Sequence, residues 1–320
     1  MTAKVLWHNL NESWLEEDLP GPVNSSGLLI KALYSMVSQG TEKTIITSKL
    51  TKKLAGKMTV PYMKGTLGKT FTYGYSMVGE VIEGEAGFLG QIVHVMHPHT
   101  DLFYVKSDDV CPVPESMDPR IATFASNMET AVNAVWDSEI EIGDHIQIMG
   151  YGVIGSLLAS IIHRFPGVVY EIIEKNDKRR QLANQHGHPV KEGDQSGESF
   201  DIIFNTTSEE QMIQKAFQRL VPDGKLIEMS WYGEKSVTLK LGSDFHYGRK
   251  RIISSQVSRI PLKKQPSWNF KKRKELVFRL LEEIDLRSHI DAVIPYSTTP
   301  QFFQQLRNED VNNFSTIIKY

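Results

Sequence analysis

Two kinds of hydrophobic pattern divide the chain. Up to about residue 120, short apolar runs are separated by turn formers such as Pro20-Gly21-Pro22 and the stretch 84–90, as is typical of β strands. We expect strands at 4–7, 28–34, 75–83, 91–96 and 101–106. No helical period longer than two turns is visible before about residue 118. The pattern therefore predicts a barrel-like β domain.

After Pro119 the apolar residues fall at helical spacing over 120–136, and helices then alternate with buried strands. We expect strands at 146–149, 168–173, 201–205, 225–230 and 251–256, and helices at 156–162, 177–186 and 209–220. This alternation predicts an α/β domain with a doubly wound parallel sheet. A basic amphipathic helix at 268–283 and a strand at 314–320 follow. The expected division is 1–120, 121–262 and 263–320, with the last part returning to the β domain.

The first strand of the parallel sheet leads into a glycine motif of the form G-x-G-x-x-G, made by Gly150, Gly152 and Gly155. The first glycine permits a tight turn, the second lets the backbone approach a pyrophosphate, and the third allows close packing of helix on strand. Val153 and Ile154 lie within this motif, ahead of the helix whose N–H groups would face the phosphates. The motif predicts a dinucleotide site.

Glu174 closes the next strand, 24 residues after Gly150, where a carboxylate can accept hydrogen bonds from the adenosine ribose. This acid favours NAD, because it would repel the 2′-phosphate of NADP. Lys175 and the pair Arg179-Arg180 leave NADP open. Thr206 and Trp231 follow the next two strands and are expected near the cofactor.

Several segments resemble the medium-chain dehydrogenase/reductase superfamily, which includes zinc alcohol dehydrogenases and quinone oxidoreductases. The segments are Y-S-M-V-S-Q-G-T-E (34–42), Y-G-Y-S-M-V-G-E-V (73–81) and M-E-T-A-V-N-A-V-W (128–136). The resemblance implies a GroES-like catalytic domain beside a Rossmann domain. S-W-Y-G (230–233), I-S-S-Q-V (253–257) and H-P-H (97–99) look closer to a bacterial, bacteriochlorophyllide dehydrogenase-like subgroup.

The resemblance fails at the catalytic zinc. The family's zinc ligands correspond to Ser38, Tyr75 and roughly Ser126, and Ser76 replaces the glutamate of the family's G-H-E motif. Serine and tyrosine hydroxyls are poor zinc ligands beside thiolate and imidazole. The four-cysteine structural zinc lobe has no counterpart either, since Cys111 is the only cysteine. We therefore expect no bound zinc.

Without zinc, side chains must polarise the substrate oxygen or exchange its proton. Tyr75 and Ser38 are candidates, although each could be a simple replacement of a lost ligand. Glu129 lies where polyol-dehydrogenase relatives place a glutamate near the metal, and it could instead cap the helix or pair with a base. Thr130 resembles the threonine that packs against the nicotinamide. His97 is a candidate general acid, or a polar residue at a strand end.

Composition limits the partners. The chain has 320 residues, 40% hydrophobic residues, 23% charged residues and a net charge of −2, which describes an ordinary globular protein of two domains. No segment approaches 18 consecutive apolar residues, so we expect a cytoplasmic protein without a membrane partner. Between residues 245 and 274 there are ten Lys or Arg and no acid, which indicates a solvated basic face or a rim that attracts an anionic substrate. Aromatic residues are too few there to favour nucleic acid, and 251–257 resembles the strand through which relatives form homodimers.

These observations favour a zinc-independent NAD(P)-dependent oxidoreductase acting on a carbonyl or alcohol of a small molecule. Two alternatives stay open. One is reduction of a quinone or an α,β-unsaturated carbonyl, and the other is a dinucleotide-sensing protein without turnover.

Overall fold

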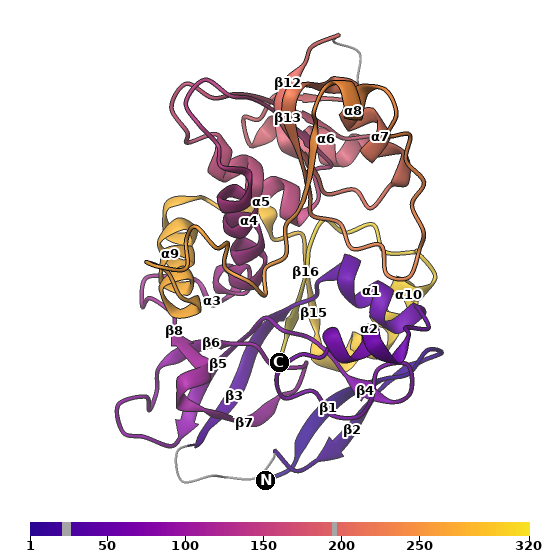
Figure 1. Ribbon diagram of the computed structural model, residues 1–320. Coiled ribbons are helices and arrows are strands. Elements are labelled where there is room, and N and C mark those ends of the chain that lie inside the picture. Colours follow the sequence, from indigo (N-terminus) through magenta and orange to yellow (C-terminus); the bar gives the residue numbers. More distant parts are fainter. Residues whose placement is uncertain (21–26, 194–196) are drawn as a thin grey trace. The chain divides into compact units, whose positions relative to one another are not determined.

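The computed structural model describes residues 1–20, 27–193 and 197–320 (Figure 1). The Gly21-Pro22 part of the expected first turn lies outside these residues. The chain divides into two compact units, one made of Met1–Ser126 with Lys274–Tyr320, the other of Asn127–Arg273. The two boundaries between the compact units therefore lie several residues after the boundaries at 120 and 262 that we expected from the sequence.

The first unit is built from two β sheets. One has three strands in the order β2-β1-β4, and the other has seven, with the path β15-β16-β3-β5-β6-β8 and β7 paired to β3. The strands are β1 (Ala3–His8), β2 (Ser13–Asp18), β3 (Gly27–Met36), β4 (Phe71–Thr72), β5 (Met77–Glu83), β6 (Ile92–Val95), β7 (Leu102–Lys106), β8 (Val110–Pro112), β15 (Ala292–Pro295) and β16 (Thr316–Lys319). All pairings are antiparallel except that of β15 with β16.

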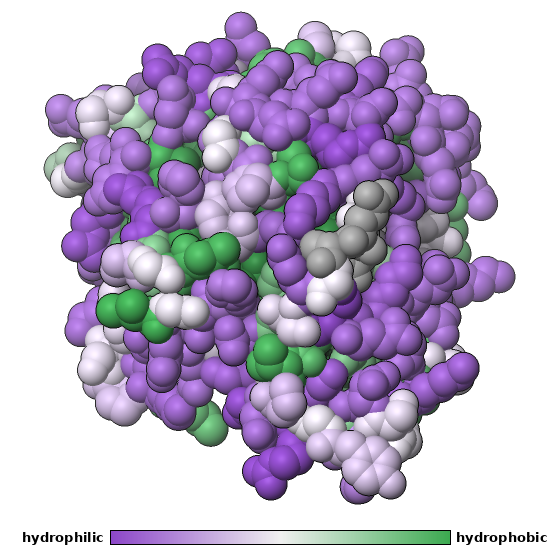
Figure 2. All heavy atoms as spheres, turned by 90° about the horizontal axis from the view of Figure 1, so that it is seen from above, coloured by the Kyte–Doolittle hydropathy of each residue, from purple (hydrophilic) through white to green (hydrophobic). Residues whose placement is uncertain are grey.

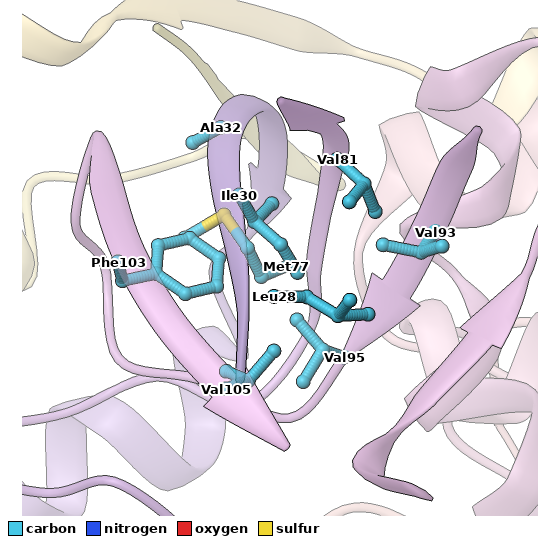
Figure 3. Packing of buried hydrophobic residues seen from close by; sticks show 9 residues of the cluster. All are labelled: Leu28, Ile30, Ala32, Met77, Val81, Val93, Val95, Phe103 and Val105. Atoms are coloured by element: carbon cyan, nitrogen blue, oxygen red, sulfur yellow. The ribbon is translucent and has the colours of Figure 1, made fainter. Parts of the chain in front are cut away.

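Alternating residues of four neighbouring strands form the core of this unit (Figure 3). Leu28, Ile30 and Ala32 of β3 are two residues apart, so they share one face of the sheet. They pack with Met77, Val81, Val93, Val95, Phe103 and Val105 of β5, β6 and β7. Gly79 is required in β5, because a Cβ atom there would lie 2.5 Å from the Cγ2 atom of Ile30.

Helices complete the first unit. They are α1 (Gln39–Thr47), α2 (Lys52–Lys57), α3 (Pro119–Ala122) and α10 (Thr299–Arg307), with 3₁₀ turns at Ser107–Asp109, Arg287–His289 and Tyr296–Thr298. Two longer helices, α4 (Ala125–Ser138) and α9 (Phe270–Glu283), contain the points where the chain passes between units.

The second unit is a parallel sheet of six strands in the order β11-β10-β9-β12-β13-β14. Numbered along the chain, this is the doubly wound order 3-2-1-4-5-6, whose direction changes between β9 and β12. The strands are β9 (His145–Met149), β10 (Val169–Ile173), β11 (Val190–Lys191), β12 (Phe200–Asn205), β13 (Leu220–Glu228) and β14 (Arg251–Ser254). The helices are α5 (Val153–Ile162), α6 (Asp177–Gln185), α7 (Glu210–Arg219) and α8 (Asp244–Tyr247) (Figure 1).

Most strands expected from the pattern are confirmed within a few residues, and so are α5, α6, α7 and α9. Two expectations are wrong. Helix α1 has nine residues and precedes residue 118, although its spacing is only weakly amphipathic. The single helix expected over 120–136 is divided into α3 and α4 at Thr123-Phe124.

The surface agrees with an ordinary globular composition. The face shown in Figure 2 is mostly hydrophilic, and its apolar side chains gather only in small separate groups. Within the described ranges, every helix is too short or too polar to span a bilayer.

Candidate active site

The glycine turn follows β9 at the point where the strand order changes direction. Gly150 has a φ of +97°, and a Cβ atom on it would lie 2.7 Å from the Oγ1 atom of Thr206. A Cβ atom on Gly155 would lie 2.1 Å from the carbonyl oxygen of Gly150. Both glycines are therefore required by the packing of the turn against helix α5 and β12.

Gly152 has a different surrounding. It is the N-cap residue of α5, in extended conformation, and the nearest atom to a Cβ placed on it is the Arg179 Nη1 atom at 3.8 Å. Val153 and Ile154 begin the helix, so their backbone N–H groups belong to the first turn, which lacks partners inside a helix. Open space above such a helix end suits a phosphate. The turn therefore fits a dinucleotide pyrophosphate.

Glu174 lies directly after β10 and is buried. Its carboxylate accepts the backbone N–H of Tyr151 and that of Asn176, each at 2.8 Å. A carboxylate has about four acceptor positions, so these two bonds leave room for ribose hydroxyls. Glu174 thus also holds the glycine turn in shape, a role that the sequence pattern did not reveal.

The three bases near Glu174 differ in their partners. Lys175 forms an ion pair with Glu209, and Arg180 bonds the carbonyl oxygens of Glu174 and Lys175 as well as Asp177. In the described part of the chain, the Arg179 side chain makes no hydrogen bond or ion pair, and its Nη1 atom lies beside Gly152. Of the three, Arg179 is the base available to an anion.

The other expected cofactor residues occupy positions in the same unit. The Thr206 hydroxyl donates to the carbonyl oxygen of Met149 at 2.9 Å, so this residue ties β12 to the glycine turn. Trp231 is half-buried in the segment after β13, and Thr130 is half-buried on α4. The structure thus brings Thr206 to the glycine turn.

Three hydroxyl groups meet in the first unit. The Tyr75 phenol lies near enough to the Ser38 and Thr41 side chains for both to affect its pKa, and all three residues are half-buried. Ser38 is the N-cap residue of α1, so the start of this helix fixes its position. Burial raises the pKa of Tyr75 to about 12, and the nearby Ser38 and Thr41 side chains act in the opposite direction. Tyr75 is therefore a protonated donor at neutral pH.

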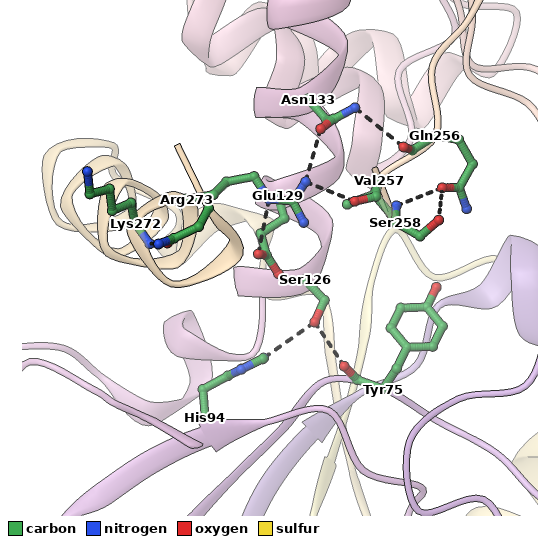
Figure 4. A network of polar contacts seen from close by, with 11 residues as sticks. Tyr75, His94, Ser126, Glu129, Asn133, Gln256, Val257, Ser258, Lys272 and Arg273 are labelled. Carbon is green, nitrogen blue, oxygen red and sulfur yellow. Dashed lines mark hydrogen bonds and ion pairs between the residues drawn. The ribbon is translucent and has the colours of Figure 1, made fainter. Parts of the chain in front are cut away.

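Ser126 lies on the backbone side of Tyr75 (Figure 4). Its hydroxyl donates to the Tyr75 carbonyl oxygen at 2.9 Å, and the Ser76 hydroxyl donates to that of Thr123 at 2.6 Å. The His94 Nε2 atom lies 3.1 Å from the Ser76 Oγ atom and 3.4 Å from that of Ser126. Burial lowers the pKa of His94 well below its ordinary value, so the ring is neutral. The sequence alone did not predict this packing of His94.

Glu129 is paired in the second unit (Figure 4). Its carboxylate lies 3.2 Å from the Arg273 Nε atom, and both side chains are buried. Arg273 also donates from Nη1 to Asn133 at 2.9 Å and to the carbonyl oxygen of Val257 at 2.8 Å. The ion pair gives Glu129 a structural role, because removing either partner would leave the other charge buried and unpaired.

His97 lies in the β domain among aromatic rings. Its ring stacks on Phe103 at 3.9 Å between centroids and on Tyr62 at 5.3 Å, and its Nδ1 atom donates to the Pro98 carbonyl oxygen. Burial lowers the pKa of His97 to about 3. A neutral ring in this setting packs as a core side chain, and within the described residues it shares no hydrogen bond with Tyr75 or Ser38.

The donors at the family's zinc positions do not fit that metal. Ser38 and Tyr75 offer only neutral hydroxyls, and the Ser126 hydroxyl donates to the Tyr75 carbonyl oxygen. In the described ranges, no three His, Cys, Asp or Glu side chains come together in an arrangement for a metal ion.

A barrel-type β unit joined to a doubly wound parallel sheet is the architecture of the zinc-type, medium-chain alcohol dehydrogenases. This chain has that fold. The 2R,3R-butanediol dehydrogenase of Bacillus subtilis matches it with a TM-score of 0.80 at 15% identity, over 99% of each chain. An alcohol dehydrogenase of Escherichia coli CFT073, solved with NADH, matches with a TM-score of 0.78 at 13% identity, over 100% of this chain and 99% of the other. The prediction of a GroES-like and a Rossmann domain is confirmed.

Sequence similarity is weaker. D-guloside 3-dehydrogenase of Shigella flexneri is 21% identical over 209 residues, which cover 60% of this chain and 59% of that enzyme. The chain therefore matches less than two thirds of the length of this relative. No family model matches the chain.

Proposed function

We propose that the protein is a NAD(P)-dependent oxidoreductase that transfers a hydride between the nicotinamide and a carbonyl or alcohol carbon without zinc. The Tyr75 phenol carries this proposal, because it stands at one of the family's metal positions and offers a proton donor there, with the Ser38 and Thr41 hydroxyls nearby. The expectation that NAD is preferred belongs to the same proposal.

The glycine turn supports dinucleotide binding. Gly150, Gly152 and the start of α5 would hold the pyrophosphate, and Glu174 would accept the ribose hydroxyls. The bound cofactor would supply or accept the hydride. Arg179 lies beside the same turn and could contact a 2′-phosphate, which keeps NADP as a second cofactor.

Tyr75 supports the proton step. In carbonyl reduction, a hydride added to the carbonyl carbon breaks the C=O π bond, and the oxygen takes a proton from the phenol. A phenol with a pKa of about 12 is fully protonated at neutral pH and is closer to an alcohol in acidity than free tyrosine is. Ser38 and Thr41 would then donate to the phenolate until it regains a proton from solvent. These properties favour the reductive direction.

The relatives suggest a substrate class. Butanediol dehydrogenase and D-guloside 3-dehydrogenase are, by name, enzymes that act on a diol and a sugar derivative. We propose a secondary alcohol or ketone of a hydroxylated small molecule as the substrate class. The Arg and Lys residues between 249 and 274 would favour an anionic member of this class.

Kinetics with a matched pair of variants tests the proposal. Purified, chelator-treated protein would be assayed with NADH and NADPH against ketones and hydroxyketones, beginning with 2,3-butanedione and acetoin. Tyr75→Phe should lower kcat by about 100-fold, the usual contribution of a general acid. Tyr73→Phe is the control, because its hydroxyl donates to the Met58 carbonyl oxygen, outside the cluster.

Three results would contradict the proposal. Activity that is lost on chelation and regained with zinc would assign the chemistry to a metal. Equal activity of Tyr75→Phe and the parent protein would remove Tyr75 from the proton step. Tight NADH binding without turnover of any carbonyl, enone or quinone tested would favour a dinucleotide-sensing protein.

A further inference from the structure

Two polar residues end neighbouring strands on the side of the glycine turn that is opposite to Glu174. Asn205 is the last residue of β12 and Glu228 the last of β13, and the two are partners in the parallel register. Asn205 has 0% of its surface exposed, and Glu228 is half-buried. The Asn205 Nδ2 atom donates to the Glu228 Oε2 atom at 2.8 Å. Strand ends of this kind form the edge at which doubly wound sheets bind their ligands.

The Asn205 amide uses each of its hydrogen-bonding positions. Its Nδ2 atom also lies 3.2 Å from the Tyr232 hydroxyl, and its Oδ1 atom accepts the Thr207 backbone N–H at 3.1 Å and the Thr207 hydroxyl at 2.7 Å. An amide offers two donor hydrogens and two acceptor positions, and a carboxylate only accepts. The orientation of the amide is therefore fixed, with its nitrogen towards Glu228 and its oxygen towards the loop after β12.

Glu228 is held from the segment after β13. Its Oε1 atom accepts the Ser230 backbone N–H at 2.9 Å, and the Ser230 Oγ atom in turn accepts the Ser208 backbone N–H at 2.9 Å. The Tyr232 hydroxyl lies 3.5 Å from the Glu228 Oε2 atom, and the Tyr232 ring packs against the core of the parallel sheet. The carboxylate thus connects the segment after β13 to the loop after β12.

The loop at 206–208 needs this support. Ser208 has a φ of +56°, in the left-handed region that residues other than glycine rarely adopt. The loop also packs on the glycine turn, since the Thr206 hydroxyl donates to the Met149 carbonyl oxygen at 2.9 Å. A Cβ atom on Gly150 would lie 3.1 Å from the Thr207 Cγ2 atom. A loop that left this conformation would change the surface beside the turn.

We propose that Asn205 and Glu228 form a positioning pair for the nicotinamide half of the cofactor. The adenosine half would lie at the end of β10, where Glu174 stands, and the pyrophosphate at the start of α5. The nicotinamide half would then extend over the ends of β12 and β13, on the other side of β9. There the pair holds the loop at 206–208 in the shape that borders the nicotinamide. This role rests on the proposed function, whereas the hydrogen bonds of the pair do not.

An exchange of the two side-chain groups tests the pair. The double variant Asn205→Asp with Glu228→Gln moves the carboxylate to β12 and the amide to β13. The new amide can donate to the new carboxylate, which still accepts from Thr207, and the amide oxygen still accepts from Ser230. Each single variant breaks the arrangement. Glu228→Gln leaves one oxygen for two donors, and Asn205→Asp places two like charges together at pH 8.

Calorimetric titration of the full chain at pH 8 compares NADH with AMP, which contains the adenosine half alone. We expect each single variant to raise the Kd for NADH about tenfold, the equivalent of one lost charge-assisted hydrogen bond. The Kd for AMP should not change. The double variant should return to within about twofold of the parent in its Kd for NADH. The proposal would be overturned by an unchanged Kd for NADH in the single variants, by equal losses for NADH and AMP, or by a double variant as weak as the single ones.

Glu171→Gln is the matched control. The Gln147 Nε2 atom donates to the Glu171 Oε1 atom at 2.8 Å, and these two buried residues are register partners in β9 and β10. This pair has the same chemistry in the same sheet, but it lies two residues before the strand ends. The control should bind NADH with the Kd of the parent. A loss equal to that of Glu228→Gln would assign the effect to a weakened sheet and would overturn the proposal.

Amide hydrogen exchange without ligand separates this proposal from the proposed function. The Thr207 and Ser208 N–H groups are bonded to Asn205 and Ser230, so their exchange should be faster in both single variants and return to the parent rate in the double variant. If the parent bound neither NADH nor NADPH, the proposed function would fail, and the exchange would still decide the pair. Exchange that is unchanged in the single variants would refute the support of the loop. If one single variant failed to fold, the other and the double variant would give the same comparison.

Discussion

Gly152 and Gly155 lie three residues apart in one motif, yet the structure gives them different tasks. Alanine at Gly155 would place its Cβ atom 2.1 Å from the Gly150 carbonyl oxygen, so helix and turn would have to separate by about an ångström. Alanine at Gly152 meets only the end of the Arg179 side chain at 3.8 Å, at a φ of −87° that any residue adopts. The two substitutions should therefore separate folding from binding.

The two substitutions should change the free energy of unfolding in different directions. Gly155→Ala should lower the free energy of unfolding by about 1–3 kcal/mol, the range for overpacked sites. Gly152→Ala should leave it unchanged or raise it by about 0.4–1 kcal/mol, since alanine restricts the unfolded chain. If a pyrophosphate lies above α5, the added methyl group displaces it. Losing one or two charge-assisted hydrogen bonds, at about 1.5–3 kcal/mol each, raises the Kd for NADH at least tenfold.

Fluorescence titration with NADH and urea denaturation, applied to the parent and both variants, measure these effects. A stable Gly152→Ala variant with the Kd of the parent would refute the placement of the phosphates at the start of α5. A Gly155→Ala variant as stable as the parent would refute the close packing. Loss of both properties in both variants would show that the motif acts as a single structural element.

Three further predictions concern His97, Glu129 and Arg179. Because burial holds the pKa of His97 at about 3 against 6.5 in the unfolded chain, the unfolded state binds more protons between these values, and stability falls as the pH drops below 6.5. Between pH 6 and 4, His97 contributes about 1.4 kcal/mol to the change in the free energy of unfolding per pH unit. Urea denaturation at several pH values should therefore show a pH dependence smaller by this amount in His97→Phe. His246→Gln, which changes an exposed histidine, should leave the pH dependence unchanged. Glu129→Gln leaves the buried Arg273 guanidinium without its carboxylate, so thermal denaturation should show a free energy of unfolding lower by about 3–5 kcal/mol. Adding Arg273→Met should restore part of this loss. A Glu129→Gln variant as stable as the parent protein would contradict the pairing. Arg179→Ala should weaken NADPH binding about tenfold and NADH binding far less, and equal losses in a fluorescence titration would place the guanidinium on the pyrophosphate instead.

The parallel sheet could be predicted because its signals are local. Apolar runs, glycines and turn formers occur in fixed sequence spacing, and the close contact of Gly155 with Gly150 follows from the motif itself. The expected strands of the second unit consequently agree with β9, β10, β12, β13 and β14 within a few residues, apart from an earlier start of β13.

The candidate site depends on contacts between distant segments, and there the sequence was less informative. His97 and His99 lie two residues apart in the H-P-H segment. Their neighbours separate them, since His97 stacks on Phe103 while His99 bonds to Glu42. The burial of Glu42 could not be predicted either, because the weak periodicity of α1 gave no reason to place a buried carboxylate there. Such roles appear only when the partner across the fold is known.

A metal ion polarises a substrate carbonyl by its positive charge, whereas hydroxyl groups can do so only by donating hydrogen bonds. Water-exposed hydroxyls polarise a carbonyl poorly, since solvent competes for the same hydrogen bonds. The Ser38, Thr41 and Tyr75 hydroxyls are partly withdrawn from water, which strengthens their hydrogen bonds. A positive charge beside a phenol lowers its pKa, whereas a negative charge raises the pKa and makes the phenol a weaker acid. The raised pKa of Tyr75, caused mainly by burial, therefore keeps the phenol protonated at neutral pH but leaves it a weaker acid than free tyrosine.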